Sequence, residues 1–168
     1  MKIKRAYLVE GKCEELLIKY LISKDKILPG KVYLNNITNT KITIRYLIQF
    51  NDFDEIIFVY DTDINNTNII DENIERIKEF HNRIKFYHLQ SVYTIEDEIV
   101  RASSINNIHK LFNTKTIKDY KKEFCQCSNL NDKLNKIAII PELLWTNKPN
   151  NSFDKYYNKD NQKHILKK

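Results

Sequence analysis

Only two glycines, Gly11 and Gly30, occur in this chain of 168 residues. Dinucleotide-binding fingerprints and P-loops need several glycines in one turn, because the backbone must approach phosphate closely. Two isolated glycines can form neither motif, and the sequence contains no Gly-x-Ser-x-Gly segment. These absences argue against a dehydrogenase, a kinase, a P-loop ATPase and a serine hydrolase of the α/β type.

Cysteine is also scarce, with three residues and no regular spacing. An odd, irregular set is a poor disulfide framework. Cys125 and Cys127 are separated by one residue instead of the two of a zinc knuckle, and no histidine lies at ligand spacing beside them. We therefore expect neither disulfides nor a structural zinc.

No apolar run approaches the roughly 18 residues that a membrane span needs. The basic residues near the start, Lys2, Lys4 and Arg5, are not followed by a long apolar segment or a signal cleavage site. A hydrophobic content of 42% with 30% charged residues is typical of a soluble globular protein. We expect a cytoplasmic protein without a membrane partner.

Charge is distributed unevenly along the chain. Residues 52–79 contain nine acidic and two basic residues, whereas residues 101–136 contain eight basic and three acidic ones, in a protein of net charge +6. An acidic centre within a basic protein suits a metal-dependent enzyme that acts on a polyanion. The alternative is that the lysine-rich helices are simply solvated.

The most informative segment is the apolar run at residues 56–60, which is followed by Asp61-Thr62-Asp63. Its β-branched and aromatic residues are typical of a central strand in a parallel sheet. Ligands of open α/β sheets bind at the carboxyl ends of the strands. Two carboxylates this close repel each other, and a divalent cation, most often Mg²⁺, usually stabilises such a pair.

A second acidic strand end is predicted near the amino terminus. Residues 5–9 form a short apolar run that ends on Glu10-Gly11, and apolar residues at helical spacing follow over 13–22. This pattern predicts a strand, a tight turn and a helix. Glu10 then lies at the end of the strand, with Glu14 one turn into the helix.

The alternation continues with strands at 31–35 and 83–89 and a helix at 70–81. Residues 40–50 fit either a strand or a helix, and we favour a helix because parallel strands need a crossover between them. The predicted order is βαβαβαβ. The expected fold class is α/β, with a mostly parallel sheet of about four strands and flanking helices over residues 1–100.

Thr94 and Asp97 resemble the start of a capped helix. Helical periodicity continues through residues 103–145, which predicts an all-helical extension, or cap, at 101–146 that packs on the α/β domain. The remaining residues, 147–168, are polar and lysine-rich. We expect them to form a basic, flexible tail.

The two acidic strand ends together resemble the Toprim domain of topoisomerases, bacterial primases, OLD-type nucleases and small RNA-maturing nucleases. The resemblance covers about residues 3–100 and implies a Rossmann-like α/β domain. It further implies that Glu10, Asp61 and Asp63 bind Mg²⁺ (or Mn²⁺) for phosphodiester chemistry. Without this placement, Asp61 and Asp63 could cap the following loop and Glu10 could form an ion pair.

Further candidates follow from the resemblance. Glu14 matches the second acid of nuclease-type members, and Glu96 falls where OLD-like and defence-associated members carry another acid, with Asp97 as second choice. Such a set would suffice for two cations, which together stabilise the attacking and leaving oxygens of a phosphodiester. Lys12 could contact the scissile phosphate.

The length excludes a complete topoisomerase, primase or OLD ATPase. The leading hypothesis is a small Mg²⁺-dependent nuclease that acts on RNA or DNA, in phage defence or a mobile element, alone, as a homo-oligomer or with a separately encoded ATPase. The competing hypothesis is a non-catalytic Toprim-like module that binds nucleic acid or a protein.

Overall fold

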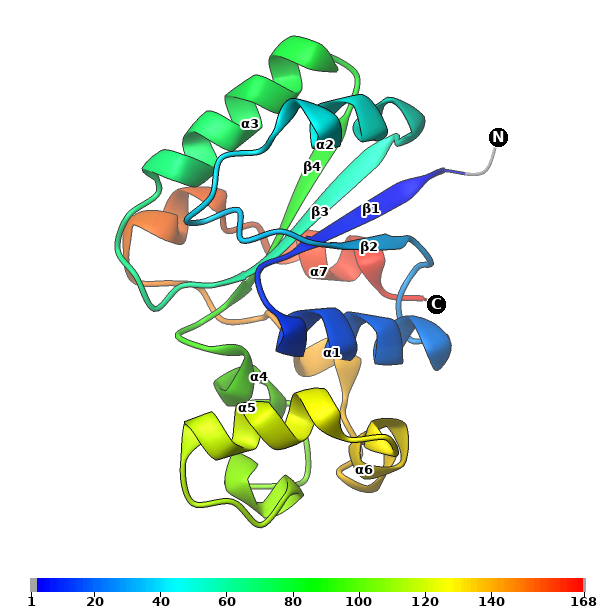
Figure 1. The fold of residues 1–168 in the computed structure, drawn as a ribbon, viewed down its shortest axis with the longest axis vertical. Helices are drawn as coiled ribbons and strands as arrows, with labels where there is room; N and C mark the ends of the chain where they lie inside the picture. The colour runs from blue at the N-terminus through cyan, green and yellow to red at the C-terminus, as the bar shows by residue number, and fades with distance from the viewer. Residues whose placement is uncertain (1–2, 168) are drawn as a thin grey trace.

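The computed structural model describes residues 3–167. In order along the chain, the strands and α-helices are β1 (Arg5–Val9), α1 (Lys12–Ser23), β2 (Lys31–Leu34), α2 (Ile44–Gln49), β3 (Glu55–Asp61), α3 (Asn68–Phe80), β4 (Lys85–Ser91), α4 (Ile95–Arg101), α5 (Ile117–Gln126), α6 (Leu130–Lys136) and α7 (Lys159–Ile165). Short 3₁₀ helices occupy Phe50–Asp52, Ile108–Leu111, Pro141–Leu143 and Ser152–Tyr156. Figure 1 shows the sheet between two groups of helices.

The four strands form one sheet in the order β2-β1-β3-β4, and every neighbouring pair is parallel. The predicted βαβαβαβ order and the α/β class are confirmed, and the ambiguous segment 40–50 does contain a helix, α2. β3 is a central strand whose residues 55–60 are all buried. Burial on both faces explains its continuous apolar run.

Separate apolar cores lie on the two faces of the sheet, because successive strand residues point to opposite sides. Tyr7 and Val59 join α1, α4, α5, α6 and α7 in one core. Leu8 and Phe58 join α2 and α3 in the other. The result is a three-layer α/β/α arrangement of the Rossmann-like kind.

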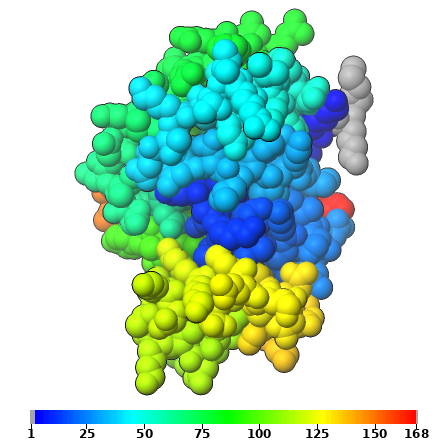
Figure 2. Space-filling view, viewed as in Figure 1, coloured from blue at the N-terminus to red at the C-terminus, as the bar shows by residue number. Residues whose placement is uncertain are grey.

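The helices between residues 95 and 136 share the core of α1. Tyr120 and Phe124 of α5 are fully buried, together with Leu17 of α1. The helices α4, α5 and α6 lie together at one end of the molecule, next to α1 (Figure 1). The surfaces of α1 and α5 adjoin (Figure 2). Within residues 3–167, no helix combines the length and the apolar character that crossing a bilayer requires.

Residues 147–167 differ from the flexible tail that the sequence predicts. They form the 3₁₀ helix Ser152–Tyr156 and α7, which bury Phe153 in one core and Ile165 in the other. Gln90 Nε2 donates to the carbonyl oxygen of Phe153 at 2.8 Å, and Asn161 Nδ2 donates to that of His88 at 3.2 Å. The segment therefore wraps around the outer edge of β4.

Candidate functional site

The carboxyl ends of β1 and β3 bring Glu10 and Asp61 together. The two strands pair with Val9 opposite Val59, and the backbone nitrogen of Glu10 donates to the carbonyl oxygen of Val59 at 3.0 Å. The Glu10 side chain then turns across the end of β3, where its Oε2 accepts a 3.1 Å hydrogen bond from the backbone nitrogen of Asp61. One acidic residue thus caps the strand that carries the other.

The loop after β2 holds the second oxygen of Glu10. Thr38 Oγ1 donates to Glu10 Oε1 at 2.8 Å. Burial raises the pKa of Glu10, the hydrogen bonds from Thr38 and from the Asp61 backbone oppose this rise, and the negative charge of Asp63 adds to it. The site therefore orients the Glu10 carboxylate while leaving its charge poorly compensated.

Glu14 lies in the first turn of α1 and its side chain folds back over the turn at Gly11. It is 5% exposed. A Cβ atom at Gly11 would lie 2.6 Å from Glu14 Oε2, so this position of the carboxylate depends on the missing side chain. Burial raises the pKa of Glu14, and the charges of Glu10 and Glu96 raise it further.

Burial together with the crowding of carboxylates also raises the pKa of Asp61. Burial and the neighbouring charges of Glu14, Glu10 and Glu96 raise the pKa of Asp61 to about 9. Its Oδ1 atom is buried and has no hydrogen-bond partner. A carboxyl group in this state is protonated at neutral pH unless a cation compensates it.

Glu96 enters from α4, in the first turn after its N-cap Thr94. It is 3% exposed, and its buried Oε1 has no hydrogen-bond partner. The closest basic group is Lys121 of α5, whose Nζ lies 3.7 Å from Glu96 Oε1. Glu14 and Glu96 are buried and Glu10 and Asp61 are half-buried. We call these four carboxylates the acidic cluster.

The other candidates lie outside the acidic cluster or at its margin. Asp63 is exposed, and only its influence on Glu10 connects it to the cluster. Lys12 is exposed and its Nζ donates to Glu15 at 2.6 Å, an interaction that holds it on the surface of α1. The Asp97 backbone nitrogen donates to Thr94 Oγ1, as expected for an N-cap, and the Thr94 hydroxyl donates to Asp97 Oδ2.

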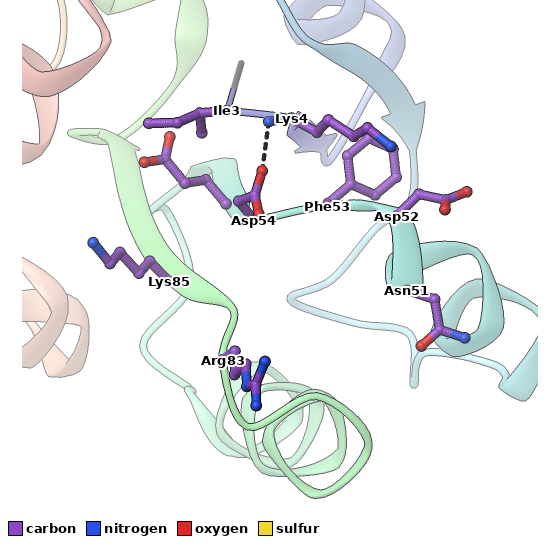
Figure 3. A pocket seen from close by; sticks show the side chains of 9 residues that line it. Ile3, Lys4, Asn51, Asp52, Phe53, Asp54, Arg83 and Lys85 are labelled. Carbon is purple, nitrogen blue, oxygen red and sulfur yellow. Dashed lines mark hydrogen bonds between the residues drawn. The ribbon is translucent and has the colours of Figure 1, made fainter. Parts of the chain in front are cut away.

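A cavity of about 790 Å³ lies at the opposite end of the sheet, around the amino ends of the strands. Lys4, Asp54 and Lys85 contribute to its lining (Figure 3). Acidic and basic side chains are mixed there, and the backbone nitrogen of Lys4 donates to Asp54 Oδ2. None of the sequence-predicted site residues lines this cavity.

The acidic cluster has the donor chemistry of a site for a hard divalent cation. Carboxylate oxygens are the ligands that Mg²⁺ prefers. Asp61 Oδ1 and Glu96 Oε1 are buried without a hydrogen-bond partner, and a cation could supply the missing interaction. In the conformation described for residues 3–167, however, no three His, Cys, Asp or Glu side chains form a group that could hold one ion. Binding would require a rearrangement of these side chains.

Two residues of the site carry no signal in the sequence. Thr38 lies in a polar loop. Lys121 lies in α5, whereas its partner Glu96 lies in α4, so the two residues are far apart in the sequence. The apolar residues of α5 indicate which side of the helix faces the core, but they do not indicate that Lys121 meets an acid from α4. Only the packing of α5 against α1 and α4 creates that contact.

No family model, curated protein or solved structure matches the chain. Any function proposed for it therefore rests on its own residues.

Proposed function

We propose that this protein is a divalent-cation-dependent phosphodiesterase of the Toprim type that hydrolyses nucleic acid, with Mg²⁺ or Mn²⁺ as the cation. One observation carries the proposal. Asp61, at the end of a central parallel strand, is surrounded by Glu10, Glu14 and Glu96, and its pKa rises to about 9. Such crowding is costly for folding, and a cation-binding role explains why it is present.

The division of roles follows from geometry. Glu10 and Asp61 come from adjacent strands and would hold the cation between them. Asp63 is exposed and would contribute a further carboxylate ligand from the solvent side. A bound divalent cation supplies charge stabilisation at the phosphate and acidifies the attacking water. Glu14 and Glu96, both buried, would be the candidates for a general base.

The charge of the whole protein supports a polyanionic substrate. The net charge is +6, and eight basic residues occur in the segment 101–136, which contains α5 and α6. A basic surface beside an acidic centre attracts nucleic acid while a cation neutralises the centre itself. RNA and DNA both have the required phosphodiester backbone.

The test is cleavage of labelled transfer RNA, ribosomal RNA and plasmid DNA in Mg²⁺, Mn²⁺ or EDTA. We expect metal-dependent cleavage by the wild type and a loss of about 100-fold or more in Glu10→Gln and Asp61→Asn. Asp52→Asn is the matched control, because Asp52 is exposed and lies at the opposite edge of the sheet. Cleavage that persists in EDTA or in both site variants would contradict the proposal.

A second candidate function is a Toprim-like binding module without turnover. It is favoured by the finding that, across residues 3–167, no three potential ligands are grouped for one ion. This alternative predicts nucleic-acid binding of equal affinity in the wild type, Glu10→Gln and Asp61→Asn, with no cleavage. Repeating the assay with a separately encoded ATPase, or with a homo-oligomeric fraction, tests whether a partner is needed for activity.

A further inference from the structure

Lys121 is a basic residue that faces the acidic cluster from the helical extension. Among residues 3–167, it is the one Lys, Arg or His that forms an ion pair with Glu10, Glu14, Asp61 or Glu96. Its positive charge lowers the pKa of both Glu10 and Glu14. The ammonium group therefore partly compensates several carboxylates at once, as a bound cation would.

The contact is loose in geometry. Lys121 Nζ lies 3.7 Å from Glu96 Oε1, a separation at which this oxygen has no hydrogen-bond partner. The Lys121 side chain is 49% exposed, whereas that of Glu96 is 4% exposed. A flexible lysine stem lets the ammonium group move into solvent, but the glutamate cannot follow it.

A divalent cation and Lys121 would compete for the same charge. Two positive charges a few ångströms apart in a partly buried site repel each other more strongly than they would in bulk water, because the effective dielectric constant there is lower. Glu96 is the buried partner, and the half-exposed lysine is the group that can leave. Binding of the cation and departure of the ammonium group are then coupled.

We propose that Lys121 is an internal counter-ion that neutralises the acidic cluster in the metal-free protein and is displaced when a divalent cation binds. This inference rests on the proposed function, because it assumes that the acidic cluster takes such a cation. It gives the helical extension a role at the site: α5 lowers the affinity for metal and limits occupancy to conditions in which the cation is abundant.

The first measurement is Mn²⁺ affinity, from the loss of the free-ion electron paramagnetic resonance signal on titration. We expect Lys121→Gln and Lys121→Met to bind Mn²⁺ about tenfold more tightly than the wild type. Lys122→Gln is the matched control, since Lys122 is the next residue of α5, is exposed and forms no ion pair within residues 3–167. Its affinity should equal that of the wild type.

The second measurement uses the wild-type protein and so does not depend on the folding of a variant. Lysines are acetylated for short times with an N-hydroxysuccinimide ester, and modification of each lysine is read by mass spectrometry. We expect Mn²⁺ to raise the labelling rate of Lys121 at least threefold and to leave the rate of Lys122 unchanged.

The outcomes separate the inference from the proposed function. If the wild type binds Mn²⁺ but Lys121→Gln binds no more tightly than Lys122→Gln, or labelling of Lys121 does not increase, the counter-ion inference is wrong and the metal-dependent function stands. If Lys121→Gln alone binds Mn²⁺, the inference is supported. If neither the wild type nor any variant binds Mn²⁺, the metal site is refuted and the inference falls with it.

Discussion

Thr38 Oγ1 donates a 2.8 Å hydrogen bond to Glu10 Oε1, which ties the loop after β2 to the acid at the end of β1. Asn73 of α3 fixes the same loop, because its Nδ2 donates to the carbonyl oxygens of Ile37 and Thr40, each at 2.9 Å. The orientation of Glu10 therefore depends on Thr38 and, through the loop, on Asn73, neither of which forms a hydrogen bond with another acid of the cluster within residues 3–167.

Thr38→Val tests this positioning role. The variant keeps the shape of the side chain but removes the donor, and we expect a loss of about 1 kcal/mol in the free energy of unfolding. The affinity for Mn²⁺ should fall by about threefold to tenfold, because Glu10 becomes less ordered. Thr38→Ser, which retains the hydroxyl, should restore both quantities. Equal Mn²⁺ affinity in Thr38→Val and the wild type would refute the role of Thr38.

Gly11→Ala and Gly30→Ala should have different effects although the substitution is the same. At Gly11 the new Cβ would meet Glu14 Oε2, the end of a flexible side chain, at 2.6 Å. At Gly30 it would lie 2.7 Å from Cε2 of the buried Tyr7 ring and 3.0 Å from Arg5 Cβ. Strand residues cannot move as easily as the Glu14 carboxylate.

We therefore expect Gly30→Ala to lower the free energy of unfolding by about 1–3 kcal/mol, as overpacking in a core does. Gly11→Ala should cost less than about 1 kcal/mol but should displace Glu14 and weaken Mn²⁺ binding. Urea unfolding and Mn²⁺ titration of both variants provide the comparison. The interpretation of Gly11 fails if its variant binds Mn²⁺ as the wild type does.

Asp61→Asn should stabilise the metal-free protein. The pKa of Asp61 is about 9 in the folded protein against an ordinary value of 3.8, so the folded state holds a proton that the unfolded chain releases between these values. Its contribution to stability is complete below pH 3.8 and is lost as the pH rises toward 9. Asparagine does not titrate, so at pH 7.5 the variant should be more stable by about 1–3 kcal/mol.

The measurement is urea unfolding between pH 5 and pH 9 in EDTA. The stability of the wild type should fall more steeply with rising pH than that of Asp61→Asn. Addition of Mn²⁺ should stabilise the wild type at pH 8 and have little effect on the variant. A variant that is less stable than the wild type throughout this range would contradict the assigned protonation state.

His88 should destabilise the protein in acid. Its Nδ1 lies 3.1 Å from the hydroxyl of Tyr60, its ring stacks on Tyr156, and burial lowers its pKa to about 3. On the Tyr156 side, the Tyr156 hydroxyl donates to Asp71, which forms an ion pair with Lys155.

The folded protein therefore leaves His88 neutral over a range in which the unfolded chain protonates it. The contribution of His88 is complete above pH 6.5 and declines as the pH falls toward 3. At pH 5 we expect a loss of about 1–2 kcal/mol relative to pH 7. His88→Phe keeps a ring to stack on Tyr156 and should lose less stability over this range in chemical unfolding; an equal loss would refute the assignment.

Much of the α/β layer could be predicted from the sequence because local signals and tertiary structure agree there. Residues 56–60 are apolar without alternation because both faces of β3 are buried. The N-cap of α4 was also predictable, since Thr94 and Asp97 bond each other within one turn. In such segments the neighbouring residues decide the structure.

The C-terminal segment could not be predicted in this way. The segment has few apolar or aromatic residues among its lysines and asparagines, and they form no long periodic pattern: Phe153, Tyr156, Tyr157, Ile165 and Leu166. The burial of Phe153 and Ile165 depends on packing against residues that are distant in the sequence, because Phe153 joins a core whose other buried residues lie at 6–77 and Ile165 joins one that starts at Tyr7. Lys121 was missed for a related reason, because its partner Glu96 belongs to another helix.

The wrapping of residues 152–165 around β4 sets an order of events during synthesis. Chains emerge from the ribosome amino terminus first, at about 5–20 residues per second. The strands and the acidic cluster leave the ribosome before the residues that cover β4. Until residues 152–165 have emerged, β4 exposes an unpaired edge that can add a strand from another chain, so slow synthesis of this segment should favour aggregation.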